Sequence, residues 1–255
     1  MSNAQSKKVG LARALSKLGY CSRAQAAQLT RAGKVNVNGA VRRDPETPVR
    51  IGKDRIEIEG HPVAAAKKIY LVLNKPRGIV TTASDEKGRD TVYSLLGADV
   101  RWIAPVGRLD KASEGLLLLT NDSEWAAGVT SPETHLDKTY HVQIGRIADA
   151  ALLEALKKGV RTKEGDTLHV KDASLLRQGE RNSWVEIILD EGKNRHIRRM
   201  VETLGIEVLR LMRVAIGPLA LGNLAKGAVR QLTAEEKLTL DRDMKQNAKA
   251  IPPRR

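Results

Sequence analysis

Phenylalanine is absent from this chain of 255 residues, and aromatic residues make up only 3% of it. Any stacking against a flat ligand must therefore use tyrosine, tryptophan, histidine or arginine. The single cysteine, Cys21, excludes an internal disulfide framework and suits a reducing compartment such as the cytoplasm. This lone cysteine and the five scattered histidines also argue against a zinc site, so we expect no bound metal.

Long hydrophobic runs are missing as well. No apolar segment approaches the length of a membrane-spanning helix, and the chain does not open on a signal peptide. The sequence also lacks a P-loop, a glycine-rich dinucleotide-binding run and a metal-ligating cluster. We therefore expect a cytoplasmic protein that uses no cofactor and does not associate with a membrane.

Positive charge is what the chain has in excess. Its 44 lysines and arginines outnumber 30 aspartates and glutamates, which gives a formal net charge of +14. Such an excess indicates a polyanionic partner, and nucleic acid is favoured over a membrane surface. The length allows one large or two modest domains with cores of their own, and we expect a monomer.

Residues 7–65 have the pattern of a small α/β unit. Apolar residues at helical spacing predict a helix over Val9–Leu18, and Ser22-Arg-Ala-Gln is a capping box that starts a second helix ending near Arg31. Asn38-Gly39 is a favoured two-residue hairpin turn between short strands, and a further strand is expected over Asp54–Glu59. Residues 64–68 are expected to be a short linker.

The two helices and the hairpin of this unit are strongly basic. The cations include Arg13, Arg23 and Lys34. From charge alone they could either contact phosphates or form a merely solvated basic face. The order helix, Cys-Ser-Arg turn, helix and Gly-Lys-Val-Asn-Val-Asn-Gly resembles the S-four-like RNA-binding domain. This resemblance implies that the unit recognises structured RNA by shape and by phosphate contacts.

The segment 104–122 organises the second region, residues 69–235. A turn leads to Asp110, and the apolar run Leu116–Leu119 that follows is typical of a strand buried on both faces. Asp110 thus lies on a loop just before a rigid strand, between the cations Arg108 and Lys111. From these residues alone, a surface turn whose aspartate pairs with its neighbours is the favoured interpretation.

Two further segments carry chemistry. Residues 135–140 read His-Leu-Asp-Lys-Thr-Tyr, and the alternation of Tyr140 with Val142 fits either a core tyrosine or a pocket wall. Residues 191–200 read Glu-Gly-Lys-Asn-Arg-His-Ile-Arg-Arg-Met and precede a helix ending near Gly205. Basic residues gathered at a helix start are unfavourable unless a phosphate or the Asp110 carboxylate offsets them, although a solvated basic helix start is the alternative.

These three segments together resemble the ribosomal-RNA pseudouridine synthases of the Rsu type. The resemblance implies that Asp110 is the catalytic carboxylate, that Tyr140 lies against the target base and that Arg198 is the basic partner of the aspartate. It also implies a set of RNA-binding residues, which with those of the first unit comprises Arg108, Lys138, Lys193, Asn194, Arg195, Arg199, Arg13, Arg23 and Lys34. The chain departs from the family pattern at His196, where glutamine is common, and at Ala112, where aspartate or asparagine is common.

The predicted fold class is α+β: a small N-terminal α/β RNA-binding domain (7–65) and a larger α+β catalytic domain (69–235) on a mostly antiparallel mixed sheet. A C-terminal helix and basic tail (236–255) follow, the helix to about Gln246 and then a disordered tail from Lys245. The sheet arrangement is what the resemblance implies, whereas the mixture of elements follows from the patterns themselves.

The predicted function is isomerisation of a specific uridine in RNA, most directly ribosomal RNA, with the target base flipped out of its stack. The alternative is a non-catalytic RNA-binding or ribosome-assembly protein on a synthase scaffold. Retention of Asp110 favours the enzyme, because binding alone requires cations but no acid. Glu114, four residues later, invites a glycosidase-like pair of carboxylates, which we discount because nothing else indicates a sugar cleft.

Overall fold

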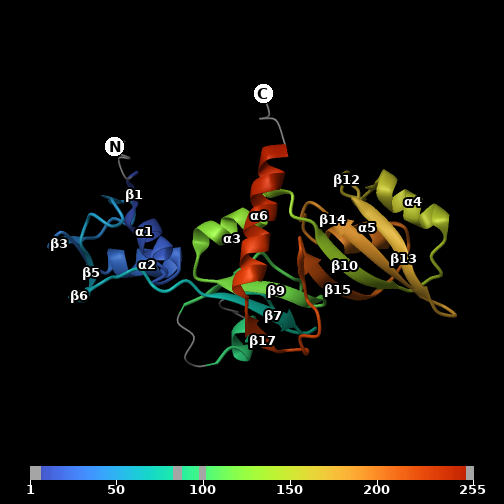
Figure 1. Cartoon of the computed structure of the whole chain (residues 1–255), viewed down its shortest axis with the longest axis horizontal. Helices are drawn as coiled ribbons and strands as arrows, with labels where there is room; N and C mark the ends of the chain where they lie inside the picture. Colours follow the sequence, from blue (N-terminus) through green and yellow to red (C-terminus); the bar gives the residue numbers. More distant parts are fainter. Residues whose placement is uncertain (1–6, 83–87, 98–101, 251–255) are drawn as a thin grey trace. The chain divides into compact units, whose positions relative to one another are not determined.

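The computed structural model describes residues 7–82, 88–97 and 102–250, which form two compact units (Figure 1). Of the described residues, the first unit contains 7–70, 102–104 and 119–126, and the second unit contains the others. The two units are described separately below.

The first unit begins with a short strand rather than a helix. Val9 and Gly10 form β1 (Val9–Gly10), which pairs with β4 (Pro48–Val49), so that α1 (Leu11–Lys17) starts two residues later than predicted. The predicted capping box of α2 (Arg23–Arg31) is confirmed. The Ser22 hydroxyl accepts a hydrogen bond from the Gln25 main-chain N–H at 3.1 Å, and the Gln25 side chain accepts one from the Ser22 N–H at 3.1 Å.

Four short antiparallel strands complete this unit in the order β3-β2-β5-β6. Their bounds are β2 Val35–Val37, β3 Ala40–Arg42, β5 Ile56–Ile58 and β6 His61–Pro62. Asn38 and Gly39 have φ values of 53° and 80°, as the predicted hairpin turn requires. Apolar residues of both helices and the strands form a separate core that includes Leu11, Leu15, Ala26, Val35 and Ile58.

The second unit is built on a nine-stranded sheet whose main path runs β13-β14-β10-β15-β9-β7-β17. The pairings of β13, β14, β10 and β15 are antiparallel, whereas β15 and β9 are parallel, which gives the mixed, mostly antiparallel sheet that was predicted. The strand bounds are β7 Tyr70–Lys75, β8 Ala104–Val106, β9 Glu114–Thr120, β10 Lys138–Ile144, β13 Asp172–Gln178, β14 Ser183–Leu189, β15 Val208–Ile216, β16 Leu219–Ala220 and β17 Val229–Gln231.

Helices α4 (Ala150–Lys158) and α5 (His196–Thr203) lie over the β10-β14-β15 part of this sheet (Figure 1). Their apolar side chains share one core with the strands, for example Leu156 of α4 and Met200 of α5. The start of α4 is fixed by Asp149, whose side chain accepts a hydrogen bond from the Leu152 N–H at 2.8 Å. The other described elements are α3 Ser123–Thr130, η1 Val92–Leu95, η2 Pro132–Thr134, β11 Val160–Arg161 and β12 Thr167–Leu168.

The C-terminal helix α6 spans Ala234–Ala250 and begins at a second capping box. Thr233 Oγ1 accepts from the Glu236 N–H at 3.1 Å, and the Glu236 side chain accepts from the Thr233 N–H at 2.9 Å. The helix continues past the predicted end near Gln246, where the Asn247 side chain donates to the His135 carbonyl at 3.3 Å. The predicted disordered tail is therefore wrong for residues 245–250, and residues 251–255 lie outside the described part.

Strand β9 is buried along its whole length, as its four leucines predicted. Within the described ranges, no helix is both long enough and apolar enough to cross a membrane.

Candidate functional site

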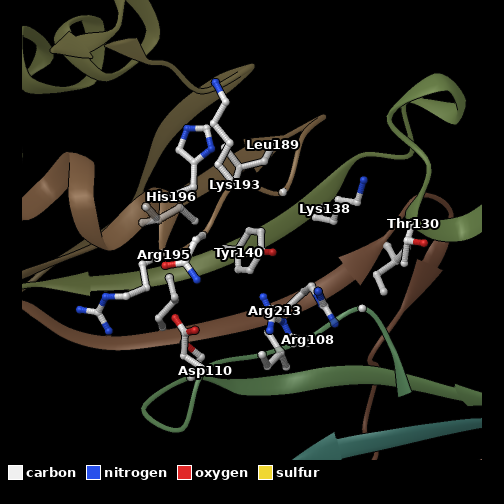
Figure 2. Close-up of a pocket in the computed structure, with 18 of the residues that line it drawn as sticks. Arg108, Asp110, Thr130, Lys138, Tyr140, Leu189, Lys193, Arg195, His196 and Arg213 are labelled. Atoms are coloured by element: carbon white, nitrogen blue, oxygen red, sulfur yellow. The ribbon is translucent and has the colours of Figure 1, made fainter. Parts of the chain in front are cut away.

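A cavity of about 280 Å³ opens in the second unit between the loop before β9, strands β10 and β15, and the start of α5 (Figure 2). Asp110 and Tyr140 both line it, so the structure brings the first two predicted motifs together. The third motif contributes Lys193, Asn194 and Arg195. Among the described lining residues, Asp110 is the only carboxylate, against the cations Arg108, Lys138, Lys193, Arg195 and Arg213.

The side chain of Lys75 binds the main chain of the loop that carries Asp110. Lys75 is fully buried at the end of β7, and its Nζ donates to the main-chain carbonyls of Asp110 at 3.1 Å, Ser113 at 2.8 Å and Pro76 at 3.1 Å. Burial lowers the pKa of Lys75 to about 8, against the opposing effect of Asp110 and Glu114. Three carbonyl acceptors therefore satisfy a lysine that water does not reach.

Two further contacts fix the same loop. The Thr81 hydroxyl donates to the Leu109 carbonyl at 2.8 Å, and the Gly78 N–H donates to the Lys111 carbonyl at 2.8 Å. The loop is thus tied to the segment after β7 on both sides of Asp110. The Asp110 side chain lines the cavity, so a rigid loop presents this carboxylate to it.

Gly115 explains how β9 can lie against β15. The two strands run parallel with Gly115 opposite Arg213, and a Cβ atom on Gly115 would lie 2.2 Å from the Arg213 carbonyl oxygen. Gly115 also has a φ of 101°, which side-chain-bearing residues rarely adopt. Only glycine therefore permits this pairing, which places Arg213 next to the Asp110 loop.

Tyr140 lies in β10, opposite Arg213 of β15 and Ile187 of β14. It is half-buried, packs against the main apolar core and also lines the cavity. Both interpretations of the alternation are therefore partly correct. In the view of Figure 2 its ring lies across the cavity from Asp110.

The start of α5 forms another wall. Arg195, the residue before the helix, has a φ of 48°, and its side chain does not cap the helix. Lys193 and Arg195 are exposed, and they pair with Glu191 at 3.1 Å and Glu202 at 3.2 Å. Exposed ion pairs of this kind are weak, so an anion in the cavity can compete for both cations.

Arg198 contacts the Asp110 loop on the side away from the cavity lining. Its guanidinium is buried and outside the cavity lining, and its Nη2 donates to the Ala112 carbonyl at 3.0 Å. Burial lowers the pKa of Arg198, Arg195 lowers it further, and the Asp110 charge opposes both effects. The recorded contact is thus with the loop rather than with the Asp110 carboxylate. Arg199 points elsewhere, since its Nη2 pairs with Glu164 at 3.0 Å and Asp166 at 2.7 Å.

The predicted RNA contacts of the first unit are on its surface. Arg13 and Arg23 are exposed and form no ion pair with other described residues, and Lys34 pairs with Glu59 at 2.7 Å. Lys75 and Arg213 of the second unit were not predicted from the sequence as residues of the site. A signal existed for each, because Lys75 alternates with Leu71 and Leu73 on the inward face of its strand and Arg213 follows Leu211 on the inward face of its own.

Glu114 does not line the cavity. Its buried carboxylate pairs with Arg210 at 2.8 Å and with Lys226 at 3.2 Å. Burial alone would raise its pKa, but the bonds to Arg210 and Lys226 outweigh burial and lower it. A glycosidase-like pair with Asp110 is therefore absent from the described cavity. His196 is buried as well, with its Nε2 at 3.0 Å from the His169 carbonyl oxygen.

One carboxylate, one tyrosine and several cations around one cavity, in a protein of strongly positive charge, fit an enzyme that acts on a polyanion. Comparison with known families makes this specific. Residues 69–203 match the family model of the RNA pseudouridylate synthases, and residues 9–56 match the S4 domain.

Individual relatives agree with the family models. The chain is 39% identical over 228 residues to the ribosomal large subunit pseudouridine synthase B of Bacillus subtilis (strain 168), covering 89% of this chain and 93% of that protein. It is 35% identical to an RNA pseudouridine synthase of Aquifex aeolicus (strain VF5), covering 87% of this chain and 89% of that protein. The crystal structure of a pseudouridylate synthase superimposes with a TM-score of 0.64 at 29% identity, covering 91% of this chain and 99% of that one.

The chain belongs to the RNA pseudouridine synthase family. It is an isomerase that converts uridine in RNA to pseudouridine, and it carries an S4 domain for RNA binding.

Proposed function

We propose that this protein modifies a specific uridine of ribosomal RNA and that Asp110 is the carboxylate that acts on the sugar of that uridine. The observation that carries the proposal is the position of Asp110. It is the one acid among the described cavity-lining residues, and two buried cations, Lys75 and Arg198, hold its loop through main-chain carbonyls. The ribosomal target is supported by the name of the Bacillus subtilis relative.

The reaction needs no outside group. The bond between nitrogen one of uracil and the anomeric carbon breaks, the base turns in place, and carbon five bonds to the anomeric carbon. Carbon five gives up its proton and nitrogen one takes one, so atoms and electrons balance without a redox step. Asp110 then acts as a nucleophile or supports the sugar-centred steps, inside a pocket that retains the free base and excludes water.

Tyr140 is proposed to stack against the target uracil once the base has left its helix. Flipping costs a few kcal/mol, least in loops and bulges, and stacking on an aromatic ring returns about 1–3 kcal/mol. The half-buried ring of Tyr140 is a suitable surface because the main core holds it on one side. Arg108, exposed at the cavity, is proposed to occupy or brace the position that the base vacates.

Arg198 is proposed as a positioning residue that orients Asp110 through the loop, since its recorded bond is to the Ala112 carbonyl. The remaining cations are proposed RNA contacts. They are Lys138, Lys193 and Arg195 with Asn194 at the cavity, Arg199 outside the cavity lining, and Arg13, Arg23 and Lys34 in the S4 domain. The net charge of +14 supports this broad contact with phosphates. We further propose that the protein works as a monomer in the cytoplasm.

Tritium release from rRNA labelled at carbon five of uridine tests this function. We expect the wild-type protein to release tritium from large-subunit rRNA, and the Asp110→Asn variant to release none while it still binds that RNA. Glu180→Gln, which neutralises an exposed carboxylate outside the cavity, is the matched control and is expected to retain full activity.

Two outcomes would contradict the proposal. Tritium release by Asp110→Asn would remove Asp110 from the reaction. Binding without release by the wild type, on both rRNA transcripts and on partly assembled particles, would favour the alternative of a non-catalytic ribosome-assembly protein.

A further inference from the structure

Arg213 is a buried cation that the proposed chemistry does not use. Only 6% of the residue is exposed, yet it lines the cavity. Its Nε donates to the Leu116 carbonyl at 2.8 Å, which fixes the guanidinium plane against β9. Its Nη2 is buried and has no hydrogen-bond partner among the described residues. Arg213 is thus a fixed cation in the cavity wall with one buried donor for which no described residue supplies an acceptor.

Two other cations line the same cavity. Lys138 is half-buried in β10, and burial together with the nearby charge of Arg213 lowers its pKa, an effect that Asp137 and Asp190 oppose only in part. Asp137 is itself paired with Lys171 at 2.7 Å. Arg108 is exposed on the loop before Asp110, and in the view of Figure 2 it lies with Arg213 toward Thr130.

Asp110 does not neutralise this group. Figure 2 draws Asp110 on the opposite side of the view, toward Arg195. No ion pair joins Arg213, Lys138 or Arg108 to an acid of the described chain, and like charges at partly buried positions repel each other. An anion bound among them would remove both the unsatisfied donor and the repulsion.

We propose that Arg213, Lys138 and Arg108 form an anion subsite that holds the phosphate next to the flipped uridine. This subsite rests on the proposed function, because it takes the target nucleotide as its ligand. Arg213 contributes a fixed donor from the cavity wall, Lys138 a second charge, and Arg108 a cation at the exposed rim. A guanidinium suits this task because its planar fork of donors matches phosphate oxygens.

The subsite has a consequence for catalysis. A phosphate bound to Arg213 fixes the ribose of the same nucleotide at a set position relative to Asp110. The cavity would then select a uridine within an RNA chain over a free nucleoside, and would retain the sugar while the detached base turns. The binding energy of the phosphate is thus used to position the ribose, and two of the groups that supply it, Arg213 and Lys138, lie on strands.

Binding of uridine, uridine 5′-monophosphate and uridine 3′-monophosphate to the full-length protein tests the subsite, measured by chemical-shift titration. We expect one of the two monophosphates to bind roughly tenfold more tightly than uridine, as one added hydrogen bond to a charged group predicts. The preferred isomer identifies which phosphate is held. In Arg213→Gln and in Lys138→Gln we expect this advantage to fall to a few-fold or less, and in Arg213→Lys to be kept in part.

Arg181→Gln, which removes an exposed arginine outside the cavity, is the matched control and is expected to keep the full advantage. Equal binding of all three ligands by the wild type would overturn the subsite, and so would an advantage that survives both glutamine variants. If Arg213→Gln does not fold, Lys138→Gln and the wild-type comparison decide. Tritium release from rRNA is measured separately on the wild type. A wild-type protein that shows normal release but no phosphate advantage rejects the subsite alone, whereas one that shows the advantage but no release rejects the synthase function alone.

Discussion

Two buried cations of the second unit, Lys75 and Arg213, meet the segment around Asp110 in different ways. Lys75 is completely buried, and its ammonium donates to three main-chain carbonyls. Arg213 is almost as buried, but among the described residues its Nε has an acceptor, the Leu116 carbonyl, and its Nη2 has none. A buried cation whose donors are all used stabilises structure, whereas one with a spare donor at a cavity is available for a ligand.

We expect the largest loss of stability from a substitution that disrupts the β9–β15 pairing, on which the position of Arg213 depends. Gly115→Ala places a Cβ atom 2.2 Å from the Arg213 carbonyl oxygen at a φ of 101°, so we expect the β9–β15 pairing to be lost, at a cost above about 4 kcal/mol in the free energy of unfolding. Urea unfolding measures it. The control is Gly39→Ala, which has a φ of 80° but nothing within 4 Å, and should cost only about 1–2 kcal/mol. Equal costs for the two variants would contradict the steric argument.

Lys75→Met tests the structural half of the comparison. Methionine fills a similar volume but leaves the Pro76 and Ser113 carbonyls without this donor, and each buried orphan costs roughly 1–3 kcal/mol, whereas the Asp110 carbonyl keeps the Ser113 N–H at 2.9 Å. We therefore expect a loss of several kcal/mol in urea unfolding, and lower tritium release even at temperatures where the variant is folded. Lys163→Met, at an exposed position of the same unit, should stay within about 0.5 kcal/mol of wild type. A wild-type-like Lys75→Met would refute the role of this lysine.

The pH dependence of stability isolates the charge of Lys75. Its pKa is about 8 in the folded protein and near 10.5 in the unfolded chain, so between these values the unfolded state binds more protons and stability rises with pH. From pH 8 to pH 10 the wild type should gain roughly 2 kcal/mol relative to Lys75→Met, which lacks the titrating group. Unfolding curves at several pH values measure this difference. Parallel pH profiles for the two proteins would show that burial does not perturb the lysine.

Local signals in the sequence predicted much of the fold. The capping box at Ser22 and the Asn38-Gly39 turn were correct because each depends on residues within a few positions. The first helix began later than predicted because Val9 pairs with Val49, a partner far along the chain. Local patterning does not contain that information.

The candidate site was predicted where a motif could be matched and missed where only long-range contacts define it. The Asp110 loop, the Tyr140 strand and the Lys193–Arg195 segment line one cavity. Lys75 meets Asp110 across 35 positions, and Arg213 meets Leu116 across 97. Both cations alternate with leucines on the inward face of a strand, which is unusual for a charged residue. Only the folded chain identifies the carbonyls that bind Lys75 and the cavity that Arg213 lines.

We expect the smallest effect on stability from Arg213→Met, and this variant separates the role of Arg213 from that of Lys75 most clearly. The substitution loses one hydrogen bond to the Leu116 carbonyl, but it also removes a buried charge and an unsatisfied Nη2. Because replacing such a group with an apolar side chain is often neutral, we expect urea unfolding to change by about 1 kcal/mol or less. The same variant should lose the phosphate advantage in ligand binding. Arg213 would then be needed for the ligand and not for the fold, which is the opposite of Lys75. A loss of stability as large as that of Lys75→Met would show instead that Arg213, like Lys75, stabilises the fold.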